Sequence, residues 1–202
     1  MAESGAFRDE VRVLLRHRLL DAAREITTAH GWSTLTMDAV ASRVGISRTH
    51  LYKEVGTKQD LGDAMVERET DNFLDLIREQ LRGHPTDLVA GFGAAARHSI
   101  EHGARNDLVK AILAADDPRA DSLLPLLTAQ PEAVLRRVTS ALSDEVSALH
   151  PHLGRDADEV PTMVDGISRI VLSHLTQPSG PTVRAVRQVE WLARAVTQEP
   201  SA

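Results

Sequence analysis

The stretch that most constrains this chain runs from Thr36 to Lys58 and reads TMDAVASRVGISRTHLYKEVGTK. Thr36 supplies a side-chain oxygen ahead of a run with helical periodicity, so we expect it to cap a short helix. Gly45 follows at the point where the chain must turn sharply and a positive φ is favoured. Ser47 is then expected to cap a second short helix. The pattern predicts two short helices joined by a glycine turn.

The spacing of apolar residues predicts how these two helices pack. Val40, Ala41 and Val44 share one face of the first helix, and Leu51 of the second helix is expected to pack back against them. Ala41 must be small because the second helix crosses directly over it. This is a helix-turn-helix, in which the second helix is the one that enters a DNA groove. The residues left on its outward face are Arg48, Thr49, His50, Tyr52 and Lys53.

With its flanks, the stretch resembles the TetR family of bacterial transcriptional regulators. A helix of about twenty residues precedes it and ends at His30–Trp32. The matching residues are Leu19, Ala22, Gly31, Leu35, Thr36, Val40, Ala41, Val44–Ser47, Leu51, Tyr52, Val55, Lys58 and Leu61. They cover the first quarter to third of the chain; many members carry Phe where this chain has Val55. The resemblance implies an all-α fold with about nine or ten helices. It consists of a three-helix DNA-binding head (residues 8–56) and a larger helical effector-binding and dimerisation body (residues 57–202).

Charge and composition fit a regulator of this kind. The net charge is −6, yet residues 8–60 hold nine Arg or Lys against seven Asp or Glu, so a basic head precedes an acidic body. The absence of cysteine excludes disulfides, thiolate metal sites and cysteine nucleophiles. No apolar run reaches membrane-spanning length and the first ten residues lack a signal-peptide layout, so a soluble cytoplasmic protein is expected.

Helical periodicity and proline or glycine stops divide the rest of the chain. Residues 1–7 are interpreted as a flexible lead. Helices are expected over about 8–30, 57–82, 87–102, 106–115, 131–149, 160–176 and 182–197, with a short segment near 123–127. The expected capping residues are Thr57, either Thr86 or Asp87, and Asn106, and Pro131 is expected at a first helical position.

The last two helices carry broad apolar stripes that have two possible partners. They can be buried within the body or can pair with a second copy in a four-helix bundle, and periodicity satisfies both. The resemblance implies the homodimer. Its candidate residues are Val164, Ile167, Val171, Leu175, Val186, Val189 and Ala193.

The first turn of the second short helix carries the candidates for base contacts. Arg48, Thr49 and His50 lie at the end that enters the major groove of double-stranded DNA first. The resemblance implies phosphate contacts from Thr36, Ser47, Tyr52 and Lys58. Lys53 can serve either purpose, and Glu54 is an acidic residue close to the expected phosphate path.

The resemblance also implies a small-molecule cavity among the middle helices. The inward candidates are Phe92, Ala96, Ser99, Ile112, Leu127, Leu135, Val138, Met163 and Ile167. Plain core packing is the alternative for each, because core and pocket share one periodicity. The body has Phe73, Phe92 and Trp191 as its aromatic residues, which favours an aliphatic or acyl-type ligand over a flat multi-ring one.

Two other kinds of site find little support. His98 and His102 have the four-residue spacing of metal ligands on one helix face, but no third ligand is fixed, so no metal site and no cofactor are expected. The chain has no nucleophile with its base, phosphate-cradling glycine loop or dinucleotide fingerprint, so no enzyme is expected.

Three hypotheses from different classes therefore remain. The leading one is a homodimeric repressor, released from a palindromic operator by a small, apolar ligand. The second is a DNA-binding regulator without a small-molecule effector. The third is a helical metal- or ligand-binding enzyme that contains a helix-turn-helix. Salt-dependent, palindrome-selective DNA binding separates the first two hypotheses from the third.

Overall fold

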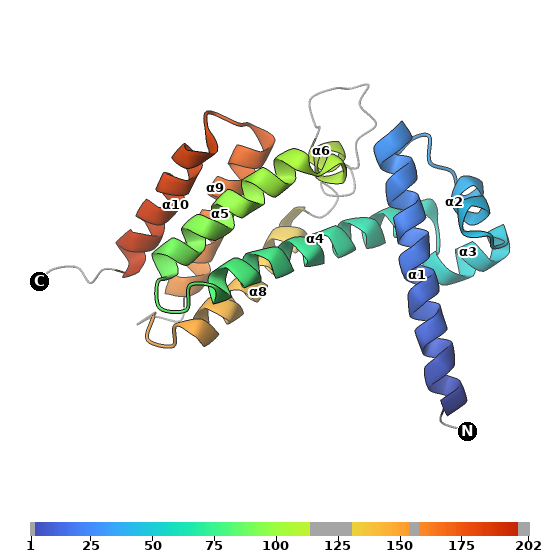
Figure 1. Cartoon of the computed structure of the whole chain (residues 1–202), viewed down its shortest axis with the longest axis horizontal. Coiled ribbons are helices and arrows are strands. Elements are labelled where there is room, and N and C mark those ends of the chain that lie inside the picture. Colours follow the sequence, from blue (N-terminus) through green and yellow to red (C-terminus); the bar gives the residue numbers. More distant parts are fainter. Residues whose placement is uncertain (1–2, 114–130, 154–157, 198–202) are drawn as a thin grey trace, which may run out of the picture. The chain divides into compact units, whose positions relative to one another are not determined.

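A computed structural model describes residues 3–113, 131–153 and 158–197, with side chains described from residue 7 and omitted for 111–134. In these ranges the chain forms nine α-helices and no strand, which confirms the all-α prediction (Figure 1). The helices are α1 (Glu3–His30), α2 (Met37–Val44), α3 (Arg48–Val55), α4 (Lys58–Arg82), α5 (Leu88–Arg105), α6 (Asp107–Leu113), α8 (Pro131–Leu149), α9 (Glu159–Thr176) and α10 (Thr182–Thr197). The predicted segment near 123–127 lies outside the described residues. None of the described helices combines the length and apolar character needed to cross a bilayer.

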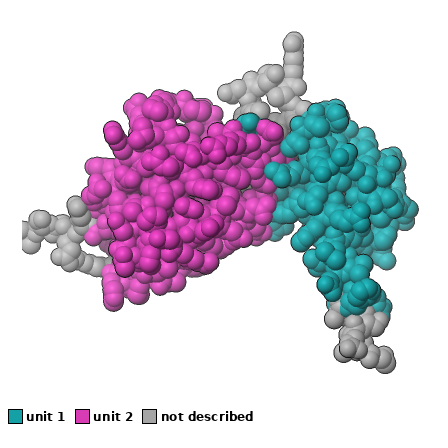
Figure 2. All heavy atoms as spheres, in the orientation of Figure 1, with its two compact units in different colours: residues 1–68, 110–129 teal, residues 69–109, 130–202 magenta. Residues whose placement is uncertain are grey.

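The chain divides into two compact units (Figure 2). Unit 1 comprises residues 1–68 and 110–129, and unit 2 comprises residues 69–109 and 130–202. The division falls inside α4, after Arg68, whereas the predicted head ended at residue 56, before this helix begins. The first turns of α4 therefore belong to the same unit as α1, α2 and α3.

The core of unit 1 is small and made of aliphatic side chains. Its fully buried members include Leu19 and Ala23 of α1, Val40 of α2, Leu51 of α3 and Leu61 of α4. These residues come from four helices that are each too short or too polar to be stable alone, so burial of this shared face holds them together.

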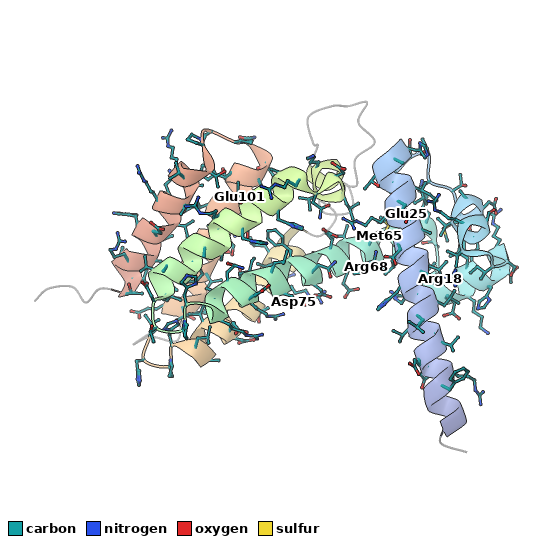
Figure 3. The ribbon with its side chains drawn as sticks, in the orientation of Figure 1. Arg18, Glu25, Met65, Arg68, Asp75 and Glu101 are labelled. Carbon is teal, nitrogen blue, oxygen red and sulfur yellow. The ribbon has the colours of Figure 1, made fainter. Side chains whose placement is uncertain are left out.

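The start of α4 is fixed to α1 by further contacts. Met65 is buried, and Arg68 follows it three residues later on α4 (Figure 3). Arg68 donates hydrogen bonds to the Asp21 carboxylate (2.8 Å) and the His17 carbonyl (3.4 Å). Unit 1 thus includes the beginning of α4 by both packing and polar contacts.

Helix α1 begins earlier than predicted. It starts at Glu3, so residues 3–7, which were expected to form a flexible lead, are helical. Phe7, Val11, Val13 and Leu14 are exposed, and the first buried residue among the described side chains of this helix is Leu19. The exposure of the first half of α1 follows from the lengths of the helices. Helices α2 and α3 have eight residues each, about 12 Å, and cannot cover a 28-residue helix of about 42 Å.

The predicted caps and turn of the helix-turn-helix are confirmed. The Thr36 hydroxyl accepts a hydrogen bond from the Ala39 N–H (3.1 Å), and the Ser47 hydroxyl accepts one from the His50 N–H (3.2 Å). Gly45 ends α2 with a φ of +80°, in the left-handed region where a side chain is strained. Local sequence chemistry therefore determines this motif.

Unit 2 is a helical body whose core gathers side chains from α4, α5, α8, α9 and α10. Helix α10 packs most extensively against α5, and α9 packs against both α8 and α10. Phe92 of α5, Val146 of α8, Val164 of α9 and Val189 of α10 are at most 2% exposed. The apolar stripes of the last two helices are thus covered by neighbouring helices of the same chain.

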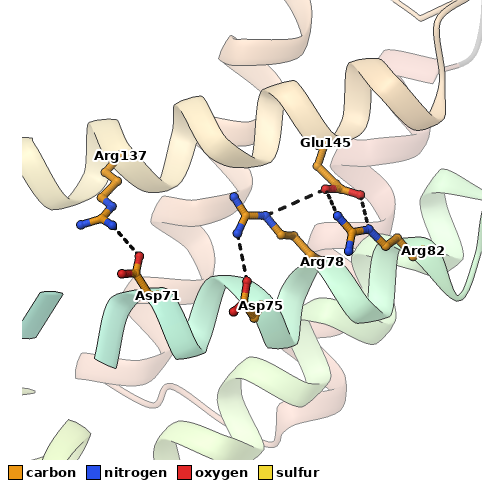
Figure 4. Close-up of polar contacts among 6 residues, drawn as sticks. All are labelled: Asp71, Asp75, Arg78, Arg82, Arg137 and Glu145. Atoms are coloured by element: carbon orange, nitrogen blue, oxygen red, sulfur yellow. Dashed lines mark hydrogen bonds and ion pairs between the residues drawn. The ribbon is translucent and has the colours of Figure 1, made fainter. Parts of the chain in front are cut away.

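A row of ion pairs joins α4 to α8 on the surface of unit 2 (Figure 4). Asp71 binds Arg137 at 2.6 Å, and the Glu145 carboxylate accepts two hydrogen bonds from Arg82, at 2.6 and 2.7 Å. Arg78 lies 3.9 Å from the same carboxylate. Hydrogen bonding to Glu145 and its charge raise the pKa of Arg82. These pairs align the two helices along their length.

A buried polar cluster joins residues of α4, α5 and α6 that lie in unit 2. The Asn106 N–H donates to the His102 carbonyl (2.9 Å) at the end of α5, and its side-chain oxygen accepts from the Leu108 (3.1 Å) and Val109 (3.3 Å) N–H groups at the start of α6. Its side-chain amide donates to the carboxylate of Glu69 on α4. Asn106 and Glu69 are each 8% exposed. Asn106 therefore ends α5, caps α6 as predicted, and connects both helices to α4 through its bond with Glu69.

Candidate nucleic-acid interface

The two faces of α3 differ sharply. Leu51 and Val55 are buried in the core of unit 1. The residues on the opposite face are all exposed: Arg48, Thr49, His50, Tyr52 and Lys53. The structure thus brings together the side chains that the helix-turn-helix pattern selected, on a helix whose first turn is capped and open to solvent.

Arg48, the first residue of α3, makes two side-chain contacts within unit 1. One terminal nitrogen (Nη1) donates to Asp38 of α2 at 3.2 Å, and the other (Nη2) donates to the Tyr52 hydroxyl at 3.3 Å. The bond to Tyr52, and then the charge of Asp38, raise the pKa of Arg48. Asp38 was not among the predicted site residues, because it is ten positions from Arg48 and meets it only once the turn has formed.

Glu54, the acidic residue near the expected phosphate path, is neutralised inside unit 1. Arg12 of α1 pairs with its carboxylate at 3.0 Å, and the side chain of Glu54 is only 11% exposed. The His50 ring nitrogen lies 3.8 Å from the same carboxylate, and Arg16 donates to the Glu54 carbonyl at 3.4 Å. The charge of Glu54 is therefore compensated by α1, a contact that helical periodicity alone does not predict.

The hydroxyls of Thr36 and Ser47 each accept one capping hydrogen bond. Because a hydroxyl carries one donor besides its acceptor lone pairs, both O–H groups keep a donor for another acceptor. They lie at the N-termini of α2 and α3, where backbone N–H groups and the helix dipole favour anions. Two helix starts and two hydroxyls together suit contact with a phosphate backbone.

Lys58, a predicted phosphate contact, makes hydrogen bonds within unit 1. Its ammonium donates to the Trp32 carbonyl (2.8 Å) and the Ser33 carbonyl (3.2 Å), and lies 4.8 Å from the centre of the Trp32 ring. Lys58 thus ties the loop between α1 and α2 to the start of α4. Two of the three donors of this ammonium are used within unit 1, which leaves one for the predicted phosphate contact.

The predicted ligand-lining residues are mostly core in unit 2. Phe92, Ala96, Ser99, Met163 and Ile167 are buried. Leu135 and Val138 are half-buried, Leu127 lies outside the described residues, and so does the side chain of Ile112. The described part of the set belongs to α5, α8 and α9, as expected for inward positions.

A hollow of about 450 Å³ lies elsewhere, on the surface between α4 and α8. Its walls carry the charged side chains of the ion-pair row and small residues: Arg78, Arg137, Ser140, Ala141, Asp144, Glu145 and Ala148. Within the described side chains, none of the predicted lining residues borders this hollow. Its polar walls do not suit an apolar ligand.

The predicted dimerisation residues are placed inside a single chain. Val164, Ile167, Val171, Val186, Val189 and Ala193 are buried in unit 2, and Leu175 is half-buried. The stripes of α9 and α10 pack against α5 and α8 of the same chain, so most of these side chains are already covered within one chain. The exposed apolar residues of the two helices are instead Leu172, Val183, Trp191 and Val196, with Trp191 68% exposed.

His98 and His102 lie next to each other on α5. Their rings are stacked, with centroids 6.4 Å apart and planes inclined by 13°. His102 also approaches the side-chain amide of Asn106 at 3.1 Å. Over the described part of the chain, no group of three His, Cys, Asp or Glu side chains is arranged to hold a metal ion.

Comparison with known proteins covers both units. Residues 19–65 match the model of the bacterial regulatory proteins of the tetR family, and residues 87–195 match the bacterial tetracyclin repressor C-terminal domain. The chain is 26% identical over 167 residues to the HTH-type transcriptional regulator AlkX of Mycobacterium tuberculosis, covering 83% of this chain and 77% of that protein. Over 67 residues, 33% of this chain and 31% of the relative, it is 36% identical to the HTH-type transcriptional activator FasR of Mycolicibacterium smegmatis.

A solved structure has the same fold. The TetR family repressor AlkX of Dietzia sp. strain DQ12-45-1b, implicated in the biodegradation of n-alkanes, superposes with a TM-score of 0.71 at 24% identity. The match covers 90% of this chain and 94% of that one. The two family models together span most of both units, and the family consists of DNA-binding transcriptional regulators. This chain belongs to the TetR family of bacterial transcriptional regulators.

Proposed function

We propose that this regulator is a homodimeric repressor that binds a palindromic operator and is released from it by a small apolar ligand. The observation that carries the proposal is the exposed first turn of α3, with Arg48, Thr49 and His50 beside two capped helix starts. Such a turn enters the major groove, where base edges present distinct donor and acceptor patterns.

Each exposed residue has a proposed role. Arg48 reads guanine, the Thr49 methyl group meets thymine, and His50 donates or accepts at a base edge. The hydroxyls of Thr36, Ser47 and Tyr52 contact phosphates and fix the register of the helix without reading sequence. Lys53 adds a cation on the same face, and Lys58 is left out of the DNA-contacting set because of its internal bonds.

A second copy is proposed to bind the outer face of α9 and α10. Leu172, Val183, Trp191 and Val196 expose apolar surface there, and aromatic anchors dominate binding energy in protein interfaces. A two-fold interface suits a palindrome, because each copy then reads one half-site. The assay is sedimentation velocity: Trp191→Asp is expected to convert the dimer to a monomer, while Lys53→Asp, on α3, leaves the dimer intact. A wild-type monomer at micromolar concentration would contradict this proposal.

The effector is proposed to be aliphatic and to bind among α5, α8 and α9. The aliphatic composition of this core supports it, as does the AlkX relative implicated in n-alkane biodegradation. Fluorescence anisotropy of a labelled operator, titrated with n-alkanes and fatty acids of increasing length, is expected to reveal a length at which DNA is released. The close packing of Phe92, Ala96 and Met163 favours the alternative, a regulator without a small-molecule effector, and release by no compound of the series would support it.

The experiment that tests DNA recognition is selection of bound duplexes from a random pool, with wild type beside Arg48→Ala and Tyr52→Ala. The expected result is that wild type enriches one palindrome. Arg48→Ala should relax the base preference at one position of it, and Tyr52→Ala should lower the affinity of the protein for every sequence. A reporter gene under that palindrome then distinguishes repression from the activation named for the FasR relative. The absence of any enriched sequence at low salt would overturn the proposal.

A further inference from the structure

We propose that Asp38 is a positioning residue for base recognition: by holding the Arg48 guanidinium against Tyr52, it sets how selectively Arg48 reads its base pair. The proposal rests on the DNA-binding function proposed above. Asp38 is the second residue of α2 and approaches the first residue of α3 across the turn. Its carboxylate forms an ion pair with Arg48, the arginine that is proposed to read a base.

The geometry divides the five N–H groups of Arg48. Asp38 takes one on Nη1 at 3.2 Å and Tyr52 takes one on Nη2 at 3.3 Å. Three N–H groups therefore take no part in these two bonds, one on each terminal nitrogen and one on Nε. A guanidinium that is hydrogen-bonded through both terminal nitrogens presents its remaining N–H groups in a fixed direction. Bidentate recognition of a guanine edge requires such a fixed direction.

The negative charge of Asp38 also acts on the choice that Arg48 makes between a phosphate and a base. An arginine that swings freely at a DNA-binding surface binds phosphates, which every sequence offers equally. A carboxylate beside the guanidinium competes with phosphate for the same donors and is itself repelled by the DNA backbone. Asp38 therefore penalises the phosphate-bound arrangement of Arg48 on any sequence, while a base edge uses the donors that Asp38 leaves available.

Tyr52 links this contact to the backbone of the DNA. Its hydroxyl accepts from Arg48 and retains its own O–H as a donor. A hydroxyl that accepts a hydrogen bond from a cation is a stronger donor, because successive hydrogen bonds polarise one another. Hydrogen bonds thus connect Asp38 to Arg48, Arg48 to Tyr52, and, in the proposed complex, Tyr52 to a phosphate. This chain of hydrogen bonds couples the base contact of Arg48 to the register of α3 on the DNA.

Asp38 also has a structural role, which the test must separate from the proposed one. An acidic residue in the first turn stabilises α2 through the helix dipole. Loss of that stabilisation lowers the folded fraction, and hence the apparent affinity for every duplex, by one common factor. A change confined to one base-pair position cannot arise in this way.

The experiment measures, at fixed salt, affinities for the selected operator and for duplexes in which each base pair of a half-site is replaced in turn. Wild type is compared with Asp38→Asn, Asp38→Glu, Arg48→Ala and, as a matched loss of one charge in unit 1, Asp63→Asn. We expect Asp38→Asn to lower discrimination roughly fivefold or more at the position that Arg48→Ala identifies, and nowhere else. It should also strengthen binding to unrelated DNA and steepen the salt dependence by about one unit of slope. Asp38→Glu should restore part of the discrimination, and Asp63→Asn should leave the pattern unchanged.

The outcomes distinguish a failure of the role inferred for Asp38 from a failure of the proposed DNA recognition. If Asp38→Asn changes all duplexes by the same factor, or acts at a position that Arg48→Ala does not affect, Asp38 is not a positioning residue. If wild type prefers no sequence, or Arg48→Ala leaves every position unchanged, the proposed DNA recognition has failed and this inference falls with it. That result is visible before any Asp38 variant is measured.

Discussion

Replacing Asn106 by alanine removes the residue that joins α4, α5 and α6, and the structure gives the size of the effect. The capping oxygen that serves the Leu108 and Val109 N–H groups is lost, which costs about 1 kcal/mol. The Glu69 carboxylate loses its amide donor at a site that is 8% exposed, which costs a further 1–3 kcal/mol or so. The expected loss of about 2–4 kcal/mol lowers the melting temperature by roughly 4–16 °C for a chain of this size.

Two further variants separate the cap from the buried bond. Asn106→Ser keeps a capping hydroxyl but cannot reach Glu69, so it should recover about 1 kcal/mol relative to Asn106→Ala. Asn106→Asp keeps the capping oxygens but sets a second carboxylate against Glu69. Two adjacent buried carboxylates raise the pKa of one of them above its unfolded value of about 4.

The sign of the resulting pH dependence follows directly. Because the folded Asn106→Asp protein binds a proton more tightly than the unfolded chain, its stability relative to wild type is greatest at low pH and falls as pH rises through the raised pKa. Differential scanning calorimetry between pH 5 and pH 8 is the assay. A deficit of Asn106→Asp that stays constant over this range, or an Asn106→Ala protein that melts within 1 °C or so of wild type, would refute the assigned bond to Glu69.

Three further predictions concern other parts of the chain. Gly45→Ala should destabilise unit 1 by about 1–2 kcal/mol, because the φ of +80° at this position strains any side chain, although no atom lies within 4 Å of the new methyl group. Gly45→Asn should cost less, because asparagine tolerates the left-handed region better than alanine does. Equal losses of stability for the two variants in urea melts would contradict this prediction. Lys58→Met should lower the melting temperature of unit 1 while leaving the salt slope of DNA binding unchanged, and a slope reduced by about one would restore this lysine to the phosphate contacts. Burial lowers the pKa of His150. Its contribution to stability is therefore present above the unfolded pKa of about 6.5 and is lost as pH falls through the folded pKa. His150→Gln should remove that part of the pH dependence of unfolding, and identical pH profiles for variant and wild type would contradict this prediction.

The features that could be predicted from the sequence are local ones. The caps at Thr36 and Ser47 and the turn at Gly45 depend on residues within four positions of one another, so composition and spacing determine them. The contact between Asp38 and Arg48 depends on how tightly two helices cross, which no spacing rule specifies.

The helical stripes of α9 and α10 show a second limit. Periodicity identified Val164 and Val189 as residues that must be covered, but it contains no information on whether the cover comes from α5 and α8 or from another molecule. The partner of an apolar face is a property of the whole fold. The early start of α1 is a similar case, because Phe7 and Val11 are helical although the described part of the chain leaves both exposed.

The extent of α4 determines where a chimeric regulator can be joined. Leu61 and Met65 belong to the core of unit 1, whereas Leu74, Ile77 and Leu81 of the same helix belong to the core of unit 2. An exchange made at the loop before Lys58 would bring a foreign helix surface into the recipient head and leave its interior mismatched. An exchange made near residue 68 keeps Leu61 and Met65 with the head, and Leu74, Ile77 and Leu81 with the body. The exchange point that keeps these α4 residues with their own cores therefore lies within a helix, after Arg68, and not at the loop before Lys58.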